Sequence, residues 1–143
     1  MPNENKIQLH ANCAAFGARA VLIRGAAGSG KSALTLQLMA YGATLVADDQ
    51  TILALRDGWP VASAPEPLRG LIEARGIGLL AAEVAAPTRV HLVVDMDSVE
   101  TDRLPASRTT DLLGQTLPLL HNTERLDFPA AILQYLRAGK VDL

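Results

Sequence analysis

The sequence predicts an α/β fold in which a mixed β-sheet is combined with few helices. Strand-like apolar patterns occur along most of the chain, whereas only two segments carry apolar residues at helical spacing. The first of these helices directly follows a glycine-rich loop, which itself follows an apolar strand. Strands combined with a minority of helices favour an α/β domain whose sheet is mixed.

The length and composition are those of one globular domain. The chain has 143 residues, so we expect a single domain over residues 1–143 that buries roughly 68–70% of its unfolded surface. Apolar residues make up 49% of the chain and aromatic residues only 3%, so Ala, Leu, Val and Ile must form most of the core.

Charge and cysteine content exclude several classes of protein. The net charge of −2 and the pI of about 5.9 come without a basic patch, so we expect no nucleic-acid partner. The single Cys13 cannot form an internal disulfide, which suits a reducing cytoplasm. Residues 1–10 lack an apolar signal core, and no apolar run approaches the ~18 residues of a membrane span. We therefore expect a cytoplasmic protein.

The N-terminal part predicts two strands, the glycine loop and a helix. Residues 6–13 alternate between apolar and polar side chains, which predicts one half-buried strand. After a turn at Gly17, an apolar run predicts a second strand over Ala20–Arg24. The glycine loop follows, and helical spacing then predicts a helix over Lys31–Tyr41 that ends at Gly42.

The middle of the chain predicts further strands. Residues 43–49, ATLVADD, predict a buried strand that ends in two aspartates. Residues 51–64 predict a β-hairpin whose turn is the Asp-Gly pair at 57–58. Proline and glycine interrupt residues 65–76, for which we expect a loop with a short extended piece. Residues 89–97, RVHLVVDMD, predict another strand.

The C-terminal part predicts a loop and a second helix. Thr101–Gln115 is polar, and we expect a flexible loop with one or two turns there. Asp127 can cap a helix that has Pro129 in its first turn and ends at Gly139.

The segment GAAGSGKS (Gly25–Ser32) matches the phosphate-loop pattern G-x-x-x-x-G-K-[ST] at every position. Its glycines let backbone N–H groups face phosphate oxygens, and the positive end of the following helix adds to the attraction. Lys31 would reach the β- and γ-phosphates, and Ser32 would offer its hydroxyl to magnesium. A chance glycine turn is the alternative, but the apolar strand before the loop and the amphipathic helix after it are the context that a phosphate loop requires. The residues expected to bind the nucleotide are Gly25, Ala26, Ala27, Gly28, Ser29, Gly30, Lys31 and Ser32.

A phosphate-loop enzyme usually needs a carboxylate at the end of an apolar strand. Asp48 and Asp49 end the strand that follows the loop by one helix, in a βαβ arrangement whose strands usually lie near each other. Asp95 and Asp97 end a later strand, which we expect to be more distant.

The two adjacent aspartates leave two interpretations open. In an extended backbone their side chains point in opposite directions, so one could serve the metal and the other the acceptor hydroxyl. They could equally be turn residues that end the strand. His10, on the polar face of the first strand, is either a catalytic residue or an ordinary surface or core histidine.

Several motifs occur in the order found in the bacterial HPr kinase/phosphorylase family, which the chain resembles from about Ile7 to Leu120. LHAN precedes the phosphate loop, and LVADD follows the helix. LIEARGIGLL (71–80) resembles the family signature LEIRGLGI, and TDRLP (101–105) resembles a D-R-[LVI]-G segment. The phosphate loop alone does not identify a family, whereas the loop followed by LVADD and EARGIG is specific to this one.

The resemblance implies a P-loop kinase-like domain with a mixed β-sheet and few helices, an activity, and the residues that perform it. Members phosphorylate a serine of HPr, the phosphocarrier protein of the sugar phosphotransferase system, with ATP and magnesium, and can remove that phosphate. Asp49 would accept the proton during phosphorylation and donate it in the reverse reaction. Ser32 and Glu73 would bind magnesium, while Lys31 would stabilise the transferred phosphoryl group. His10 and Arg103 match residues held to be catalytic.

The resemblance also makes residues 72–81 a catalytic loop. Arg75 would offer a fixed charge to phosphate, and two glycines would allow close backbone approach. The supporting residues are Asp48, Arg75, Gly76 and Gly78. Arg103 lies in a loop that could reach a phosphate of its own subunit or of a neighbour. Family members are hexamers, so the resemblance implies a homo-oligomer here too.

The chain departs from the family in three places. Longer members carry an extra N-terminal domain that we do not expect here. Ala33 stands where many members have an acidic residue. The arginine-rich motif linked to dephosphorylation corresponds to residues 119–129, where only Arg125 keeps its basic character. We therefore expect kinase activity rather than phosphorylase activity.

Two other functions stay open. The chain could be a small-molecule kinase. Such kinases usually have an arginine-rich lid, and residues 101–115 contain only Arg103 and Arg108 for that purpose. It could also be a nucleotide-dependent switch that binds HPr-like partners with little turnover.

Overall fold

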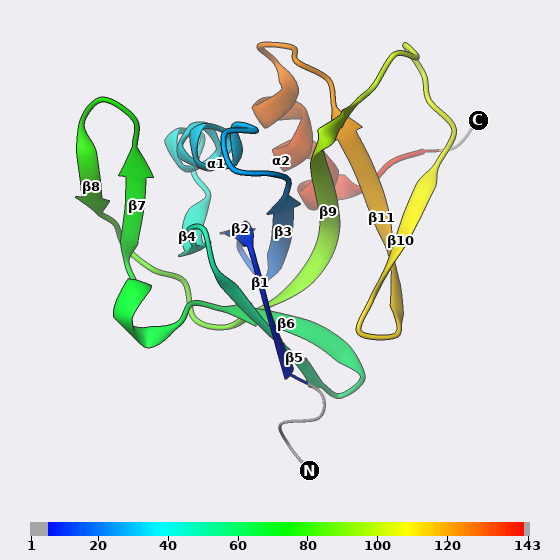
Figure 1. The fold of residues 1–143 in the computed structure, drawn as a ribbon. Helices are drawn as coiled ribbons and strands as arrows, with labels where there is room; N and C mark the ends of the chain where they lie inside the picture. The colour runs from blue at the N-terminus through cyan, green and yellow to red at the C-terminus, as the bar shows by residue number, and fades with distance from the viewer. Residues whose placement is uncertain (1–5, 142–143) are drawn as a thin grey trace.

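A computed structural model describes residues 6–141, which form a nine-stranded mixed sheet, a separate two-stranded hairpin and two α-helices (Figure 1). The predicted fold class, α/β with a mixed sheet and few helices, is confirmed. The polar residues 1–5 lie outside the described residues. The elements are β1 (Lys6–Leu9), β2 (Ala11–Phe16), β3 (Arg19–Arg24), α1 (Lys31–Ala40), β4 (Thr44–Ala47), β5 (Thr51–Arg56), β6 (Trp59–Ser63), the 3-10 helix η2 (Glu66–Leu68), β7 (Leu71–Ala74), β8 (Gly78–Ala81), β9 (Thr88–Val99), β10 (Arg108–Leu112), β11 (Gln115–Asn122) and α2 (Phe128–Ala138).

Strand β3 lies at the centre of the sheet. It pairs in parallel with β9 and antiparallel with β2, and β2 in turn pairs antiparallel with β4. All four residues from Ala20 to Ile23 are fully buried, which is expected of a strand covered on both faces. Because β3 is packed on both faces, its carboxyl end, where the phosphate loop begins, has a fixed position.

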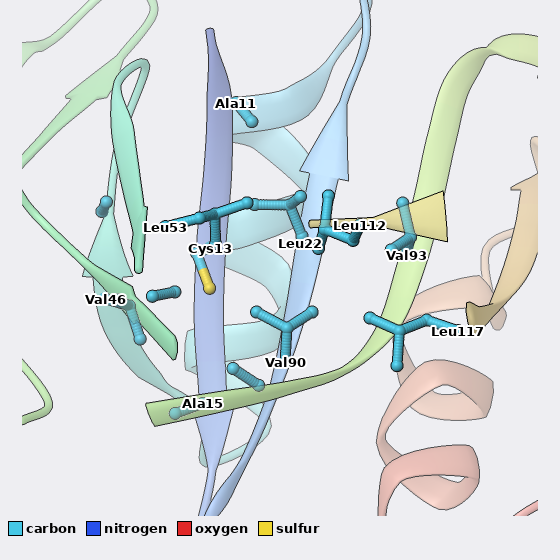
Figure 2. Packing of buried hydrophobic residues seen from close by; sticks show 13 residues of the cluster. Ala11, Cys13, Ala15, Leu22, Val46, Leu53, Val90, Val93, Leu112 and Leu117 are labelled. Carbon is cyan, nitrogen blue, oxygen red and sulfur yellow. The ribbon is translucent and has the colours of Figure 1, made fainter. Parts of the chain in front are cut away.

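Two apolar clusters lie on opposite faces of this central part of the sheet. On one face, α1 and α2 pack on Val21 and Ile23 through Leu38 and Ile132, among others. On the other face, the curled outer strands enclose a cluster around Leu22 (Figure 2). Alternate residues of β3 thus enter different clusters, as the period of two in a strand requires.

The expected single strand over residues 6–13 is wrong. The chain bends at His10, so that β1 pairs with β5 while β2 pairs with β3 and β4. Lys6, Ile7 and Gln8 are exposed, so β1 is not half-buried. Apolar and polar residues keep alternating through the bend at His10, so the sequence pattern does not indicate that the strand is interrupted there.

The expected strand order is also wrong. We expected β4 near β3 and the later strand farther away, but β9 pairs directly with β3, with Leu22 opposite Val93. Strand β2 separates β3 from β4. Strand β2 folds back beside β3 as a hairpin and takes the position next to β3 that β4 would occupy in a simple βαβ unit.

The expected flexible loop over Thr101–Gln115 is wrong in its second half. Strand β10 pairs antiparallel with β11, and β11 adds to β9 in parallel. The hairpin turn is Leu113-Gly114, with φ angles of 51° and 84°. Two-residue hairpin turns with positive φ usually carry Asn-Gly or Asp-Gly, so a turn that begins with leucine is not recognised from the sequence.

Residues 65–76 are more regular than expected. Glu66–Leu68 form η2, and β7 then pairs with β8 in a hairpin of its own, beside α1 (Figure 1). The turn has Gly76 at φ 86° and a hydrogen bond from Ile77 N–H to the Ala74 carbonyl. The segment that the family resemblance made a loop is therefore a β-hairpin.

Both predicted helices are confirmed. Helix α2 begins after Asp127 and ends at Gly139, but the Asp127 side chain makes no capping hydrogen bond. It accepts a hydrogen bond from Arg125 at 2.9 Å instead, and this bond lowers the pKa of Asp127. Within residues 6–141, neither α-helix has the length and apolar character required to cross a membrane.

Replacing Leu22 by alanine should lower the free energy of unfolding by about 2–5 kcal/mol, because a fully buried leucine leaves a cavity between packed strands. Leu126→Ala is the matched control, since that leucine is 97% exposed. Denaturant unfolding of the two variants measures both values. An equal effect at the two positions would contradict this description of the core.

Cys13 should be unreactive in the folded protein, because its side chain is fully buried and burial raises the pKa of its thiol. A colorimetric thiol reagent at neutral pH should modify it only after denaturant is added. Fast modification of the native protein would show that β2 opens to solvent.

Candidate active site

The phosphate loop (Gly25–Ser32) joins the carboxyl end of β3 to the first turn of α1. A Cβ atom on Gly25 would lie 2.6 Å from Ser29 Oγ and 3.0 Å from Met96 Cβ, so only glycine fits there. Gly30, at φ 98°, precedes the helix directly. The N–H groups of the first helical turn therefore open toward the loop, which is the arrangement that binds anions.

Lys31 is the first residue of α1, and its side chain is buried. Its Nζ atom donates hydrogen bonds to the carbonyls of Gly25 at 2.7 Å and Ala26 at 3.1 Å. The ammonium group thus bridges the start of the phosphate loop. Phosphate oxygens arriving in the loop would offer it stronger, charged acceptors.

A carboxylate from β9 holds the beginning of the phosphate loop. Ala26 N–H donates to both oxygens of Asp97 at 3.0 Å, and Asp97 N–H donates to Asp95 Oδ1 at 2.9 Å. Both aspartates were expected on a distant strand, but β9 lies next to β3. Asp97 contacts the loop backbone at Ala26, whereas the carboxylate beside the Ser32 hydroxyl belongs to Asp48.

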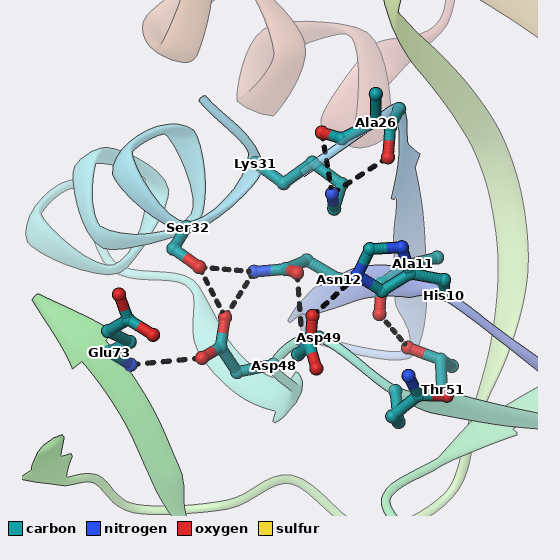
Figure 3. Close-up of polar contacts among 12 residues, drawn as sticks. His10, Ala11, Asn12, Ala26, Lys31, Ser32, Asp48, Asp49, Thr51 and Glu73 are labelled. Carbon is teal, nitrogen blue, oxygen red and sulfur yellow. Dashed lines mark hydrogen bonds and ion pairs between the residues drawn. The ribbon is translucent and has the colours of Figure 1, made fainter. Parts of the chain in front are cut away.

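Asp48 is the hydrogen-bonding centre of the site (Figure 3). One of its oxygens accepts hydrogen bonds from Ser32 Oγ and Asn12 Nδ2, both at 2.6 Å. The other oxygen accepts the Glu73 N–H at 2.9 Å. This buried carboxylate therefore joins the phosphate loop, β2 and the β7–β8 hairpin.

Asp49 faces the opposite way. Its backbone has φ 69°, so the chain turns here, whereas opposed side chains were expected from an extended backbone. Its Oδ1 lies 2.6 Å from His10 Nε2, and the two side chains are 60% and 46% exposed. The two adjacent aspartates therefore differ: the Asp48 carboxylate is buried, and the Asp49 carboxylate is exposed to solvent.

Sequence analysis missed Asn12. This residue is fully buried on β2, and its amide contacts Ser32, Asp48 and the backbone of Asp49. The available signal was its position two residues after His10, on the same side of an alternating strand. Asn12 is polar, whereas its neighbours Ala11 and Cys13 are apolar and buried.

Most of these groups line one cleft with a volume of about 570 Å³, whereas Gly25, Ala26, Ser29 and Asp97 lie outside its lining. The β7–β8 hairpin supplies one wall through Glu73, Arg75 and Ile77, and the phosphate loop supplies another. Gly76 shapes the turn of the hairpin, and Gly78 begins β8, but neither lines the cleft. The predicted residues in the lining are His10, Ala27, Gly28, Gly30, Lys31, Ser32, Asp48, Asp49, Glu73 and Arg75.

Arg103 does not line this cleft. It is exposed in the segment between β9 and β10. That segment is anchored by Glu100, which accepts hydrogen bonds from the Arg108 guanidinium and from the N–H groups of Thr101 and Asp102. The hydrogen bond with Arg108 lowers the pKa of Glu100. Residues of the segment line a second cavity, of about 270 Å³, next to α2.

The donor set of the cleft suits magnesium bound together with phosphates. No cluster of three or more His, Cys, Asp or Glu side chains forms a metal site within residues 6–141. Mg²⁺ is usually bound through one or two carboxylates and fills its shell with water and substrate phosphates, so it does not need such a cluster. Ser32 and Glu73, the residues expected to hold it, both line the cleft. Carboxylates at Asp48, Asp49 and Glu73 would repel a polyphosphate unless a cation accompanied it.

Comparison with known proteins gives a consistent result. A family model for the HPr Serine kinase C-terminal domain matches residues 4–121. The HPr kinase/phosphorylase of an Exiguobacterium species (strain AT1b) is 35% identical over 114 residues, which cover 74% of this chain and 34% of that protein. The corresponding Malacoplasma penetrans protein is 29% identical over 119 residues, with 78% and 38% covered.

The fold is also similar to a solved structure. The Hpr(Ser) kinase/phosphatase from Coxiella burnetii matches with a TM-score of 0.76 and 27% identity, covering 92% of this chain and 88% of that one. The chain spans 34% and 38% of the two curated relatives above, so it corresponds to only a part of those proteins.

Gly25→Ala should abolish binding of a nucleoside triphosphate, because the added methyl group would push Ser29 and Met96 away and distort the loop. Gly17→Ala is the control, since that glycine also has positive φ but open space and lies outside the loop. Equilibrium binding of a fluorescent nucleotide checks both variants. Normal binding by Gly25→Ala would contradict the role of the loop.

Proposed function

The chain belongs to the HPr serine kinase family through the family's C-terminal domain, and from this premise we propose that it phosphorylates a serine of an HPr-type phosphocarrier protein with ATP and magnesium. Residues 1–143 would act as one catalytic domain in the cytoplasm. The observation that carries the proposal is a single cleft in which the phosphate loop faces the His10–Asp49 pair.

The phosphate loop and Lys31 would bind the triphosphate. Lys31 would exchange the carbonyls of Gly25 and Ala26 for the β- and γ-phosphates. Ser32 and Glu73 would hold magnesium, which when bound neutralises charge on those phosphates. The Ser32 hydroxyl supports this role, because it donates its proton to Asp48 and keeps one lone pair available besides the one that faces Asn12 Nδ2 at 3.4 Å.

Asp49 would act as the general base. The acceptor serine oxygen would bond to the γ-phosphorus, the bond from that phosphorus to the β–γ bridging oxygen would break, and ADP would leave. The serine proton would pass to the Asp49 carboxylate, which His10 holds at 2.6 Å. Exposure of both side chains supports a macromolecular acceptor, since a protein serine must approach from solvent.

Arg103 would stabilise the charge that spreads over the transferred phosphoryl group, as arginine does in other phosphoryl transfers. Its exposed place outside the cleft supports delivery from a neighbouring subunit. A homo-oligomer, hexameric as in the family, is therefore part of the proposal. Arg75, on the cleft wall, would contact phosphate within the same subunit.

The proposal favours kinase activity over phosphorylase activity. The region that corresponds to the family's arginine-rich motif contains Arg125, whose guanidinium is paired with Asp127. The pair is exposed and therefore weak, but the other arginines of the motif are absent from this region, which leaves little positive charge to bind inorganic phosphate. Release of phosphate from serine-phosphorylated HPr by the purified protein would contradict this part of the proposal.

The proposed function predicts that the protein, with ATP and magnesium, adds one phosphate to a serine of the organism's HPr-type carrier, read by intact mass spectrometry. Lys31→Ala should remove the activity, while Lys6→Ala, on the exposed strand β1, should keep it. ATP binding without a phosphorylated carrier would favour the small-molecule kinase or the nucleotide-dependent switch instead.

Asp49→Asn should reduce turnover by roughly 10²–10⁴-fold, the usual contribution of a general base. Asp57→Asn is the matched control, because Asp57 also has positive φ, at 53°, and lies in the β5–β6 turn. Asparagine tolerates this backbone conformation, so neither variant should unfold. Full activity of Asp49→Asn would remove the general-base role.

A further inference from the structure

Asn12 is a polar residue at one of the most buried positions of the molecule. Its exposed fraction is 0%, and its neighbours on β2, Ala11 and Cys13, are buried as completely. A buried amide group destabilises a fold unless each of its polar atoms has a partner. The partners of Asn12 therefore show what the side chain is for.

Both ends of the Asn12 amide are used at the site. The Nδ2 atom donates to Asp48 Oδ1 at 2.6 Å and to Thr35 Oγ1 at 3.1 Å, with Ser32 Oγ at 3.4 Å. The Oδ1 atom accepts the Asp49 N–H at 2.9 Å. A backbone N–H can only donate and a carboxylate is the natural acceptor, so the orientation of the amide is determined.

We propose that Asn12 is a positioning residue for phosphoryl transfer, an inference that rests on the proposed function. Its donor holds the Asp48 carboxylate beside Ser32, and its acceptor holds the backbone of Asp49 (Figure 3). Asp49 can then keep its positive φ and direct its side chain to His10. One side chain thus orients both the metal-binding hydroxyl and the general base.

Few other side chains could perform this task. Leucine has a similar size but neither a donor nor an acceptor. Aspartate keeps the acceptor for the Asp49 N–H but loses the donor and directs a second carboxylate at Asp48. Serine is too short to reach both aspartates, although it would leave room for a bridging water. Glutamine adds a methylene group in a closely packed place.

A merely structural role for Asn12 is the alternative, and Thr51 offers a matched comparison. Thr51 is also 0% exposed, and its hydroxyl donates to the Ala11 carbonyl at 2.8 Å. This bond joins β5 to β2 one residue from Asn12, but it touches none of the groups proposed to act on ATP or serine. Thr51→Val therefore removes a buried hydrogen bond without disturbing the site.

The first measurement needs no acceptor protein. ATP binding is titrated against Mg²⁺ for wild type, Asn12→Leu, Asn12→Ser and Thr51→Val, and melting temperatures are recorded. Asn12→Leu should raise the Mg²⁺ concentration at half-saturation by roughly 10–100-fold, the usual effect of removing a partner of a metal ligand. Asn12→Ser should be intermediate, and Thr51→Val should resemble wild type.

The second measurement separates kcat from KM in the HPr phosphorylation assay. A positioning role predicts a lower kcat for both Asn12 variants at saturating ATP and Mg²⁺. Combining Asn12→Leu with Asp48→Asn should cost less than the product of the two single effects, because Asn12 acts through Asp48. A fully multiplicative loss would overturn this coupling.

The outcomes distinguish the inference from the proposed function. If wild type binds ATP with Mg²⁺ but leaves HPr unmodified, the proposed function fails, while the Mg²⁺ titration still decides the role of Asn12. If wild type phosphorylates HPr and the Asn12 variants bind and turn over like Thr51→Val, the inference is overturned. If Asn12→Leu does not fold, Asn12→Ser provides the same comparison.

Discussion

The site is organised by one requirement: a buried carboxylate must find hydrogen-bond donors within the protein. Asp48 lies at the end of β4 with little access to water, so its oxygens must find partners in the protein. It finds them in the Ser32 hydroxyl, the Asn12 amide and the Glu73 N–H. Because these donors belong to three separate parts of the fold, satisfying one carboxylate aligns the phosphate loop, the sheet and the β7–β8 hairpin.

The phosphate loop is consequently held at both ends by carboxylates. Asp97 on β9 accepts the Ala26 N–H at the beginning of the loop, and Asp48 accepts the Ser32 hydroxyl at its end. Between these contacts, Lys31 folds back on the loop carbonyls. This arrangement gives the loop a defined shape, which would reduce the reorganisation required by the nucleotide binding that we propose.

The neighbouring residues Asp48 and Asp49 show how one turn can divide two tasks. The positive φ of Asp49 directs one carboxylate into the protein and leaves the other exposed beside His10. The sequence motif identified both residues as candidates and gave the right sense of opposed side chains. It could not show the turn that causes this arrangement, because the pattern continues to read as a strand up to Asp49.

The sequence alone determined the phosphate loop, both helices, the β5–β6 hairpin and the order of motifs that leads to the family. These features obey local rules, such as glycine placement and helical spacing, which act within a few residues. Only the tertiary structure decided that β2 lies between β3 and β4, that Asn12 contacts Asp48, and that Arg103 lies outside the cleft. Such contacts join residues far apart in the chain and depend on packing between whole strands, for which no local pattern carries a signal.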